Sequence, residues 1–267
     1  MSKPANAGVT LPVVLAIGGH DPSGGAGIQA DIETIGALGC HAATALTALT
    51  VQDTRNVHAL HPVDPSLLHD QIRCVLEDMV VDVVKIGLLG SAAAVHAVKA
   101  ALSDRPDVQL VLDPVLAAGG GAELSDNALR EAIRDRLLSR TFLVTPNTIE
   151  ASRLTGEAEP GVAAECLREL GCANVLISGG HEPGEQVVNH WFGANGARET
   201  WRWPRLDGSF HGSGCTLASA CAALLARGTP LKLALRLGQA FTQDALARAH
   251  APGRGQALPR RAQVTAR

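Results

Sequence analysis

The chain has 267 residues, of which 46% are hydrophobic, 18% charged and 3% aromatic, and its formal net charge is −3. Without a basic excess or stacking aromatic residues, the composition argues against a polynucleotide partner. No run approaches the roughly 20 apolar residues of a membrane span, and residues 1–11 lack the apolar segment of a signal peptide, so we expect a cytoplasmic protein without a membrane partner.

Short apolar runs alternate with helical stretches along most of the chain. The runs are continuously apolar, as in parallel strands that are covered on both faces. They predict strands at Val13–Ile17, Ala43–Leu49, Val83–Ile86, Val108–Leu112, Phe142–Val144 and Val175–Ile177. The intervening helices are predicted at Ile28–Leu38, Ser66–Asp78, Ser91–Leu102, Ser125–Leu137 and Ala163–Leu170.

The remaining elements complete an α/β fold. Val187–Phe192 and Glu199–Trp203 flank a glycine-containing turn and predict an antiparallel hairpin at one edge of the sheet, and helices follow at Gly214–Ala226 and Leu231–Ala247. The whole pattern predicts a three-layer α/β/α sandwich around a mostly parallel sheet with right-handed crossovers. We expect one domain over residues 1–267, with loosely ordered tails at 1–11 and 252–267.

A glycine-rich run follows the first strand, Gly18-Gly19-His20-Asp21-Pro22-Ser23-Gly24-Gly25-Ala26-Gly27-Ile28-Gln29-Ala30-Asp31. Strand, glycine-rich turn and helix form the layout of a ligand-binding loop in α/β proteins. It is not a P-loop, because no Gly-Lys-Ser/Thr follows, and it is not a dinucleotide fingerprint. Asp31 is expected in the first helical turn, where a carboxylate is favoured and can orient a substrate; a solvated Asp at a helix start is the alternative.

A second glycine-rich run, His211-Gly212-Ser213-Gly214-Cys215-Thr216, opens directly into a helix of small residues. Unpaired N–H groups and partial positive charge at a helix N-terminus hold a phosphoryl group. The same field lowers a thiol pKa, so we expect Cys215 to be a thiolate that accepts a proton from an attacking hydroxyl. The alternative is an ordinary loop-to-helix junction with a buried cysteine. The six cysteines form no C-x-x-C pair, so neither a zinc site nor a redox motif is indicated.

These two runs and four further motifs resemble the hydroxymethylpyrimidine and phosphomethylpyrimidine kinases of thiamine synthesis, in the ribokinase superfamily. The further motifs follow in the family's order: Thr50-Val51-Gln52-Asp53-Thr54-Arg55-Asn56-Val57, Lys85-Ile86-Gly87-Leu88-Leu89, Leu112-Asp113-Pro114-Val115 and Thr145-Pro146-Asn147-Thr148-Ile149-Glu150. The resemblance extends from about Val13 to Ala247. It implies a ribokinase-like fold and a kinase that phosphorylates 4-amino-5-hydroxymethyl-2-methylpyrimidine, and its monophosphate, with ATP.

The resemblance also assigns residues to the two ends of the site. At the pyrimidine it implies Asp31, Gln52, the Gly19 backbone, Leu88 and Val115; the amide of Gln52 can both donate and accept at the edge of an aminopyrimidine. The catalytic anion hole comprises Gly212, Ser213, Gly214 and Cys215. Asn147, Ser178, Gly180 and His211 are expected on the ATP side, with His211 a loop residue rather than a base.

ATP brings several negative charges, so we expect Mg²⁺ held by few protein oxygens. Asp113 and Glu150 are the candidate ligands. Asn147-x-x-Glu150 resembles the magnesium motif of the superfamily, and the same residues also predict a capping box at a helix start.

Two departures from the family leave alternatives open. Leu116-Ala117-Ala118-Gly119-Gly120-Gly121 and Ser178-Gly179-Gly180-His181 stand where many relatives carry a lysine, so two cations that face phosphate are missing, which weakens nucleotide binding. A pyridoxal kinase, which shares the cysteine, is one alternative. A pyrimidine-binding or sensing protein without catalysis is another, although the Gly-Ser-Gly-Cys and Asn-x-x-Glu runs serve phosphoryl transfer. We expect a homodimer whose ligands are the pyrimidine and ATP.

Overall fold

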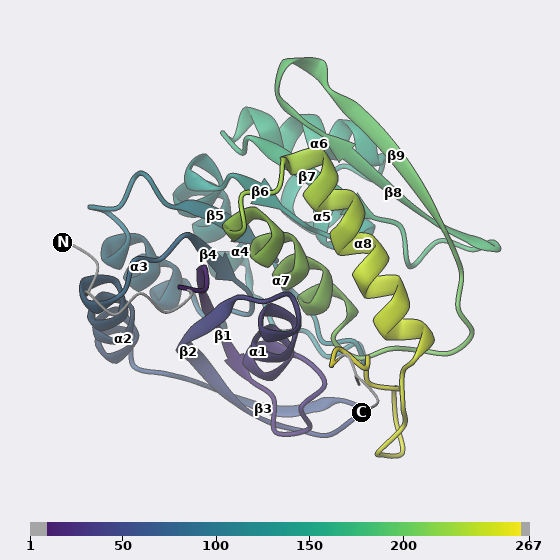
Figure 1. The fold of residues 1–267 in the computed structure, drawn as a ribbon, viewed down its shortest axis with the longest axis horizontal. Helices are drawn as coiled ribbons and strands as arrows, with labels where there is room; N and C mark the ends of the chain where they lie inside the picture. The colour runs from purple at the N-terminus through teal and green to yellow at the C-terminus, as the bar shows by residue number, and fades with distance from the viewer. Residues whose placement is uncertain (1–9, 263–267) are drawn as a thin grey trace.

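A nine-stranded sheet, in the order β3-β2-β1-β4-β5-β6-β7-β8-β9, forms the middle layer of the computed structural model, which describes residues 10–262 (Figure 1). Its parallel part comprises β1 (Val13–His20), β2 (His41–Gln52), β4 (Val83–Ile86), β5 (Gln109–Leu112), β6 (Leu143–Val144) and β7 (Asn174–Ser178). Antiparallel strands extend both edges: β3 (Val57–Pro62) at one, β8 (Gln186–Phe192) and β9 (Arg198–Pro204) at the other. The predicted sandwich and its edge hairpin are confirmed, whereas β3 was not predicted.

Helices cover both faces of the sheet. One face packs against α2 (Pro65–Asp78), α3 (Ala92–Ala101), α4 (Asn127–Ala132), α5 (Thr148–Thr155) and α6 (Pro160–Glu169). The other packs against α1 (Gly27–Ala37), α7 (Ser213–Ala226) and α8 (Leu231–Ala247). None of the helices within residues 10–262 has the length and apolar character needed to cross a bilayer.

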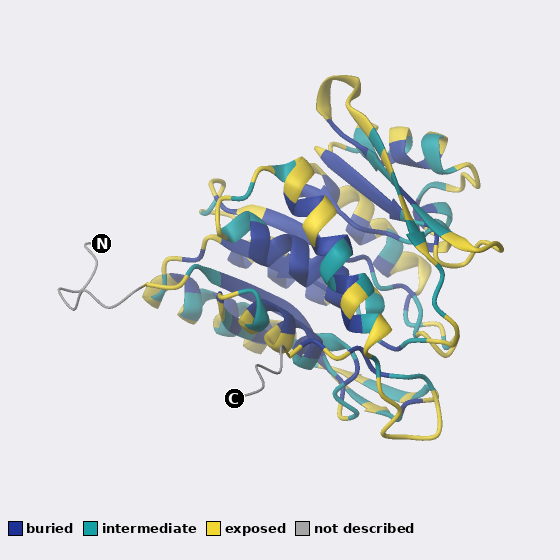
Figure 2. Ribbon diagram, turned by 45° about the vertical axis from the view of Figure 1, so that its right-hand side comes forward, coloured by how far each residue is buried: buried dark blue, intermediate teal, exposed yellow. Residues whose placement is uncertain are grey.

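Side chains of the parallel strands alternate between the two helix layers. Leu15 and Ile17 belong to the core beneath α2 to α6, and Val14 and Ala16 to the core beneath α1, α7 and α8. A strand that is buried on both faces has no polar side to alternate with, which explains the continuous apolar runs. Figure 2 shows the sheet and α7 as the buried centre of the molecule.

One predicted helix differs in extent from that observed, and the bounds of another helix were not predicted. The predicted helix Ser125–Leu137 begins at Asn127 as α4, then becomes a π-helical turn at Ile133–Leu137 and a 3₁₀ turn at Leu138–Arg140. The capping-box sequence marked the start of α5, but this helix has only 8 residues, too few for apolar periodicity to define it.

The segment 252–262 corrects the predicted loosely ordered tail. Its backbone pairs with neighbouring loops: Gln256 N–H donates to the Thr54 carbonyl (2.8 Å), and the Ala257 carbonyl accepts from His211 N–H (2.9 Å). Leu258 is 5% exposed and Arg261 1% exposed. These partners lie far away in the sequence, so local composition did not indicate them. The rest of the predicted tails, residues 1–9 and 263–267, lies outside the described residues.

Gln239 of α8 lies in a buried polar cluster next to the end of β7. Its side-chain oxygen accepts hydrogen bonds from Asn189 Nδ2 and Trp203 Nε1, both at 2.9 Å. The side-chain oxygen of Asn189 in turn accepts from Gly179 N–H at 3.1 Å. The cluster therefore holds the backbone that follows β7.

We predict that Gln239→Leu lowers the free energy of unfolding by about 1–3 kcal/mol, because it leaves the buried Asn189 donor and the half-buried Trp203 donor without their acceptor. Gln243→Leu, one turn later in α8, is the matched control. Its amide donates to the Pro204 carbonyl at an exposed position, so the loss should stay below about 1 kcal/mol. Urea denaturation measures both, and equal losses would contradict the prediction.

Candidate active site

A cavity of about 490 Å³ opens where the parallel strands end. Residues at or just after the ends of β1, β2, β4, β5, β6 and β7 line it, together with the N-terminus of α7. Open α/β sheets place their ligands at this edge. The cavity brings together all of the predicted site residues except Asp31: Gly19, Gln52, Leu88, Asp113, Val115, Asn147, Glu150, Ser178, Gly180, His211, Gly212, Ser213, Gly214 and Cys215.

The N-terminus of α7 opens into this cavity. Gly212 is its N-cap with φ 85°, in the left-handed region, and no side chain caps the helix. A side chain at Gly212 would collide with the carbonyl oxygen of Gly25 in the first glycine loop, so both the backbone conformation and the close approach require glycine. The amides of the first turn of α7 are thus available to an anion, as the sequence predicted.

Cys215 is half-buried at the cavity wall, and its surroundings disfavour the predicted thiolate in the free protein. Burial raises the pKa of its thiol to about 12, and the nearby Asp113 and Asp31 carboxylates act in the same direction. The Lys85 ammonium and Gly27 N–H lower the pKa but do not compensate for the burial. The electrostatic field of the helix follows from the sequence, whereas the free-energy cost of removing the thiolate from water depends on the folded structure.

Asp31 lies beneath the cavity rather than in its wall, contrary to the prediction. Asp31 is the fifth residue of α1, just past its first turn, and its completely buried side chain points to Lys85 of β4. Its two carboxylate oxygens lie 2.8 and 3.0 Å from Lys85 Nζ, and Ser219 Oγ donates to it at 2.6 Å. Although burial by itself lowers the pKa of Lys85, the Asp31 carboxylate and its other neighbours raise it. Asp31 therefore balances a buried lysine.

Asp113 and Glu150 present buried carboxylates at the cavity, and Asp113 lies close to Gly214 in the first turn of α7. Oδ2 of Asp113 is buried and has no hydrogen-bond partner among residues 10–262. Glu150 accepts from Asn147 N–H at 2.9 Å, and Asn147 Oδ1 accepts from Glu150 N–H at 2.8 Å, so the predicted capping box is confirmed. Burial, followed by the charge of Asp113, raises the pKa of Glu150 to about 8.

These two acids fit a divalent cation. Both are buried, and burial raises the pKa of Asp113 as well. A cation between such groups removes the electrostatic cost of their charges, and carboxylate oxygen is the ligand that Mg²⁺ prefers. No group of three or more His, Cys, Asp or Glu residues in positions 10–262 could hold a metal by itself, so phosphate and water oxygens would supply the other ligands.

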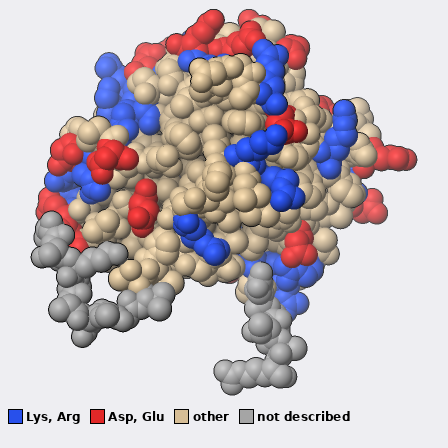
Figure 3. Space-filling model, turned by 45° about the horizontal axis from the view of Figure 1, so that its top comes forward, with Lys and Arg blue, Asp and Glu red and all other residues tan. Residues whose placement is uncertain are grey.

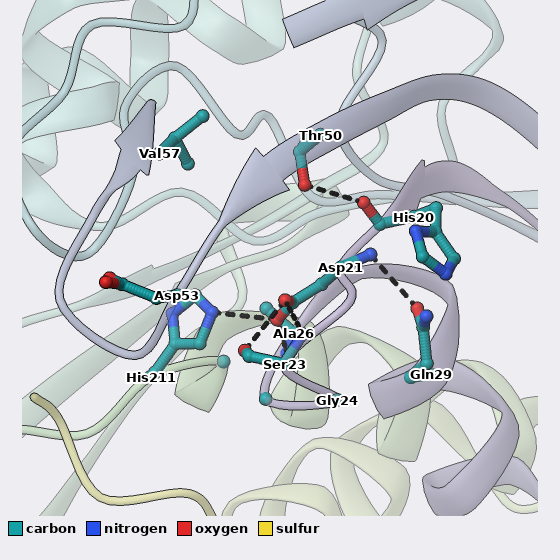
Figure 4. Close-up of polar contacts among 12 residues, drawn as sticks. His20, Asp21, Ser23, Gly24, Ala26, Gln29, Thr50, Asp53, Val57 and His211 are labelled. Carbon is teal, nitrogen blue, oxygen red and sulfur yellow. Dashed lines mark hydrogen bonds and ion pairs between the residues drawn. The ribbon is translucent and has the colours of Figure 1, made fainter. Parts of the chain in front are cut away.

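Asp21, which the sequence analysis did not single out, connects the two glycine-rich loops (Figure 4). Its carboxylate accepts from Ser23 N–H (2.8 Å) and Ala26 N–H (2.7 Å) within the first loop, and it lies 2.8 Å from His211 Nε2 in the second. Burial raises the pKa of Asp21, but hydrogen bonds from His211, Ser23 and Gln52 outweigh it and lower that pKa. The Asp-Pro-Ser-Gly sequence is typical of an Asx turn and was the available signal.

Basic side chains in the cavity wall are few. Within the described chain, the lining includes His20, His181 and His211 but neither lysine nor arginine. This agrees with the two lysine positions that the sequence showed to be substituted. The α7 N-terminus is therefore the principal positive feature for phosphate among the lining groups.

We predict that Lys85→Met lowers the free energy of unfolding by about 3–5 kcal/mol, since it leaves Asp31 as an uncompensated buried charge. Adding Asp31→Asn should restore part of the loss, because the second change removes that charge. Urea denaturation, or recovery of folded protein if the single variant does not fold, measures the difference. A double variant no more stable than Lys85→Met would contradict this account of the pair.

Comparisons with known proteins agree on one group. The family model described as phosphomethylpyrimidine kinase matches residues 21–259. A thiamine biosynthesis bifunctional protein from Geobacter sulfurreducens is 42% identical over 91% of this chain, which spans about half (50%) of that relative. A hydroxymethylpyrimidine/phosphomethylpyrimidine kinase from Streptomyces coelicolor is 39% identical, with 89% of this chain and 90% of the relative covered.

Solved structures show the same fold. A Bacillus subtilis pyridoxal kinase in complex with ADP superposes with a TM-score of 0.87 at 27% identity, covering 94% of this chain and 98% of that one. A phosphomethylpyrimidine kinase from Clostridium difficile superposes with a TM-score of 0.77 at 32% identity, covering 88% and 99%. Sequence similarity is thus higher to the pyrimidine kinase, and backbone similarity is higher to the pyridoxal kinase.

Proposed function

Because the chain belongs to the phosphomethylpyrimidine kinase family, we propose that it transfers the γ-phosphoryl group of ATP to the hydroxymethyl group of 4-amino-5-hydroxymethyl-2-methylpyrimidine, and then phosphorylates the monophosphate. The relatives of this name and the matched family model support the assignment. The observation that carries it is the open N-terminus of α7, which faces the same cavity as Gly19, Gln52 and the Asp113–Glu150 pair.

In this proposal, separate sets of residues bind the pyrimidine and ATP. The pyrimidine ring lies between Leu88 and Val115, and its polar edge meets the Gln52 amide. The substrate oxygen attacks the γ-phosphorus, the bond to the β-phosphate oxygen breaks, and ADP leaves. The amides of Ser213 to Cys215 stabilise the charge on the transferred group. Asn147, Ser178 and Gly180 lie on the nucleotide side.

Asp113 and Glu150 would hold Mg²⁺, which supplies charge neutralisation of the phosphates when bound. Cys215 lies at the first turn of α7, where the attacking hydroxyl loses its proton. Because desolvation raises the pKa of this thiol, it first releases its own proton to water when the ligands bind and then accepts the proton of the hydroxyl.

A cytoplasmic, single-domain homodimer remains part of the proposal. The free edge strand β3 neighbours β2, where Leu49 and Val51 are 48% and 53% exposed. Pairing such an edge with a second copy would cover it. Size-exclusion chromatography with light scattering would report the oligomeric state.

Over the face shown in Figure 3, acidic and basic side chains are intermixed, so no continuous positive field covers that face.

Replacing Cys215 tests its proton-transfer role. We predict that Cys215→Ala lowers kcat by about 10²–10⁴-fold while pyrimidine binding, measured by calorimetry, changes little. Cys215→Ser should recover little, because a hydroxyl is harder to deprotonate than a thiol. An alanine variant with nearly full kcat would remove Cys215 from the mechanism, and an active serine variant would show that a neutral group suffices.

Glu150→Gln tests the metal site. The glutamine keeps the capping box, so we predict a higher Mg²⁺ requirement with a smaller change in the pyrimidine KM. Folding raises the pKa of Glu150 from 4.5 to about 8, so the folded metal-free protein keeps a proton that the unfolded chain has lost, and its stability falls as the pH rises from about 4.5 to about 8. The variant should therefore lack that part of the pH dependence of unfolding. An unchanged metal requirement combined with a lower Tm would leave only the capping role.

Substrate choice between the pyrimidine and pyridoxal tests the assignment itself. The solved pyridoxal kinases of similar fold make pyridoxal phosphorylation the second candidate. Gln52 can pair with the ring nitrogen and amine of the pyrimidine, so we predict a higher kcat/KM for the pyrimidine in a coupled ATP-turnover assay. Gln52→Leu should reduce the difference in transition-state free energy between the two substrates by roughly 1–3 kcal/mol.

Two results of this assay would redirect the proposal. Comparable efficiency on both substrates, unchanged in Gln52→Leu, would favour the pyridoxal kinase. Tight pyrimidine binding without turnover on either substrate would favour the binding or sensing protein.

A further inference from the structure

Arg261 contacts both glycine-rich loops, although it follows residue 259, where the family match ends. Its side chain is 1% exposed and it is among the largest fully buried side chains of residues 10–262. Its neighbour Arg260 is exposed. A completely buried guanidinium has to be paired, so its partners indicate what it holds in place.

The guanidinium divides its hydrogen bonds between the two loops. Nη2 donates to the Gly25 carbonyl and Nη1 to the Gly24 carbonyl (3.5 Å), both in the first loop. Nε donates to Thr216 Oγ1 at 2.9 Å in the first turn of α7. The Thr216 hydroxyl in turn donates a hydrogen bond to the Gly212 carbonyl at 2.7 Å. The rigid guanidinium of Arg261 therefore fixes the distance between the first glycine-rich loop and the N-cap of α7.

The loops it joins are already in close contact. The missing side chain of Gly212 leaves room for the Gly25 carbonyl, and a side chain at Gly25 would collide with His211 and Leu258. The Asp21–His211 hydrogen bond spans the same junction nearer the cavity. Gly24 and Gly25 offer no side chains of their own, so the arginine supplies the connection that these glycines lack.

Its charge also adds to the field at α7. Glu33 Oε2 lies 3.0 Å from Nη1, but the Glu33 side chain is 52% exposed, so water screens this partner more than the buried guanidinium. A cation beside a helix N-terminus disfavours the helix and favours a bound anion. The cavity lining in residues 10–262 contains no lysine or arginine, so the Arg261 guanidinium is one of few positive charges near the cavity.

We propose that Arg261 is a positioning residue for phosphoryl transfer: it holds the first glycine loop and the N-terminus of α7 at the separation at which the substrate hydroxyl meets the transferred group. The proposal rests on the proposed kinase function. A displacement of about 1 Å between reacting groups lowers the rate on the order of 10²-fold, while each ligand can still bind to its own loop. The expected signature is thus a fall in kcat with little change in KM.

The test compares Arg261→Met and Arg261→Lys with the matched control Arg260→Met. Methionine removes both the charge and the hydrogen bonds. Lysine keeps the charge but lacks the planar group that reaches Gly24, Gly25 and Thr216 together. We expect kcat to fall by about 10–100-fold in Arg261→Met and by a smaller factor in Arg261→Lys, with the pyrimidine KM changing less than about threefold. Arg260→Met should match the wild type.

Hydrogen–deuterium exchange supplies a readout that does not depend on activity. Amides in residues 22–27 and 211–217 should exchange faster in the Arg261 variants and at the wild-type rate in Arg260→Met. A folded Arg261→Met with kcat within twofold of wild type would overturn the proposal, as would a loss of kcat without faster exchange in both segments. If Arg261→Met does not fold, Arg261→Lys decides by the same measurements.

The same experiments distinguish a failure of the proposed kinase function from a failure of the positioning role of Arg261. A wild-type chain without kinase activity would refute the proposed function, and exchange in the two segments would still show whether Arg261 holds them. If the wild type is active and the Arg261 variants keep its kcat and its exchange rates, only the positioning role is refuted.

Discussion

The junction between the two glycine-rich loops is the contact on which the rest of the site depends. One loop follows β1 and the other precedes α7, so nearly 200 residues separate them, yet the Asp21–His211 hydrogen bond joins them directly. We propose that the first loop holds the substrate, whereas the second carries the open N-terminus of α7. In that proposal their separation sets the geometry in which a hydroxyl and a phosphoryl group meet.

Buried charge beneath this junction is only partly balanced. Lys85 pairs with Asp31, whereas within residues 10–262 neither Asp113 nor Glu150 forms an ion pair. We propose that these two acids hold the metal, because a divalent cation would lower the cost of their burial. Desolvation, followed by the charges of Asp113 and Asp31, raises the pKa of the Cys215 thiol in the same region.

The sequence predicted the architecture from its local patterns, and most of the cavity residues from its resemblance to the pyrimidine kinases. Continuous apolar runs identify parallel strands, and motifs placed at strand ends converge at one edge of the sheet. Asp31 was assigned to the substrate because the sequence did not show that its side chain pairs with the buried Lys85. The predicted thiolate took account of the helix field alone, because the opposing desolvation of Cys215 is a property of the assembled fold. Arg261 and the ordered segment 252–262 gave no local signal, because their partners lie in distant loops.

The central claim is that the two loops present one ligand each to a common point. A crystal structure with the hydroxymethylpyrimidine and a non-hydrolysable ATP analogue tests it most directly. The account predicts the pyrimidine next to Gly19 and Gln52, the γ-phosphate on the amides of Ser213 to Cys215, and the substrate oxygen in line with the phosphorus. A γ-phosphate bound away from the α7 N-terminus, or a pyrimidine bound outside the first loop, would contradict it.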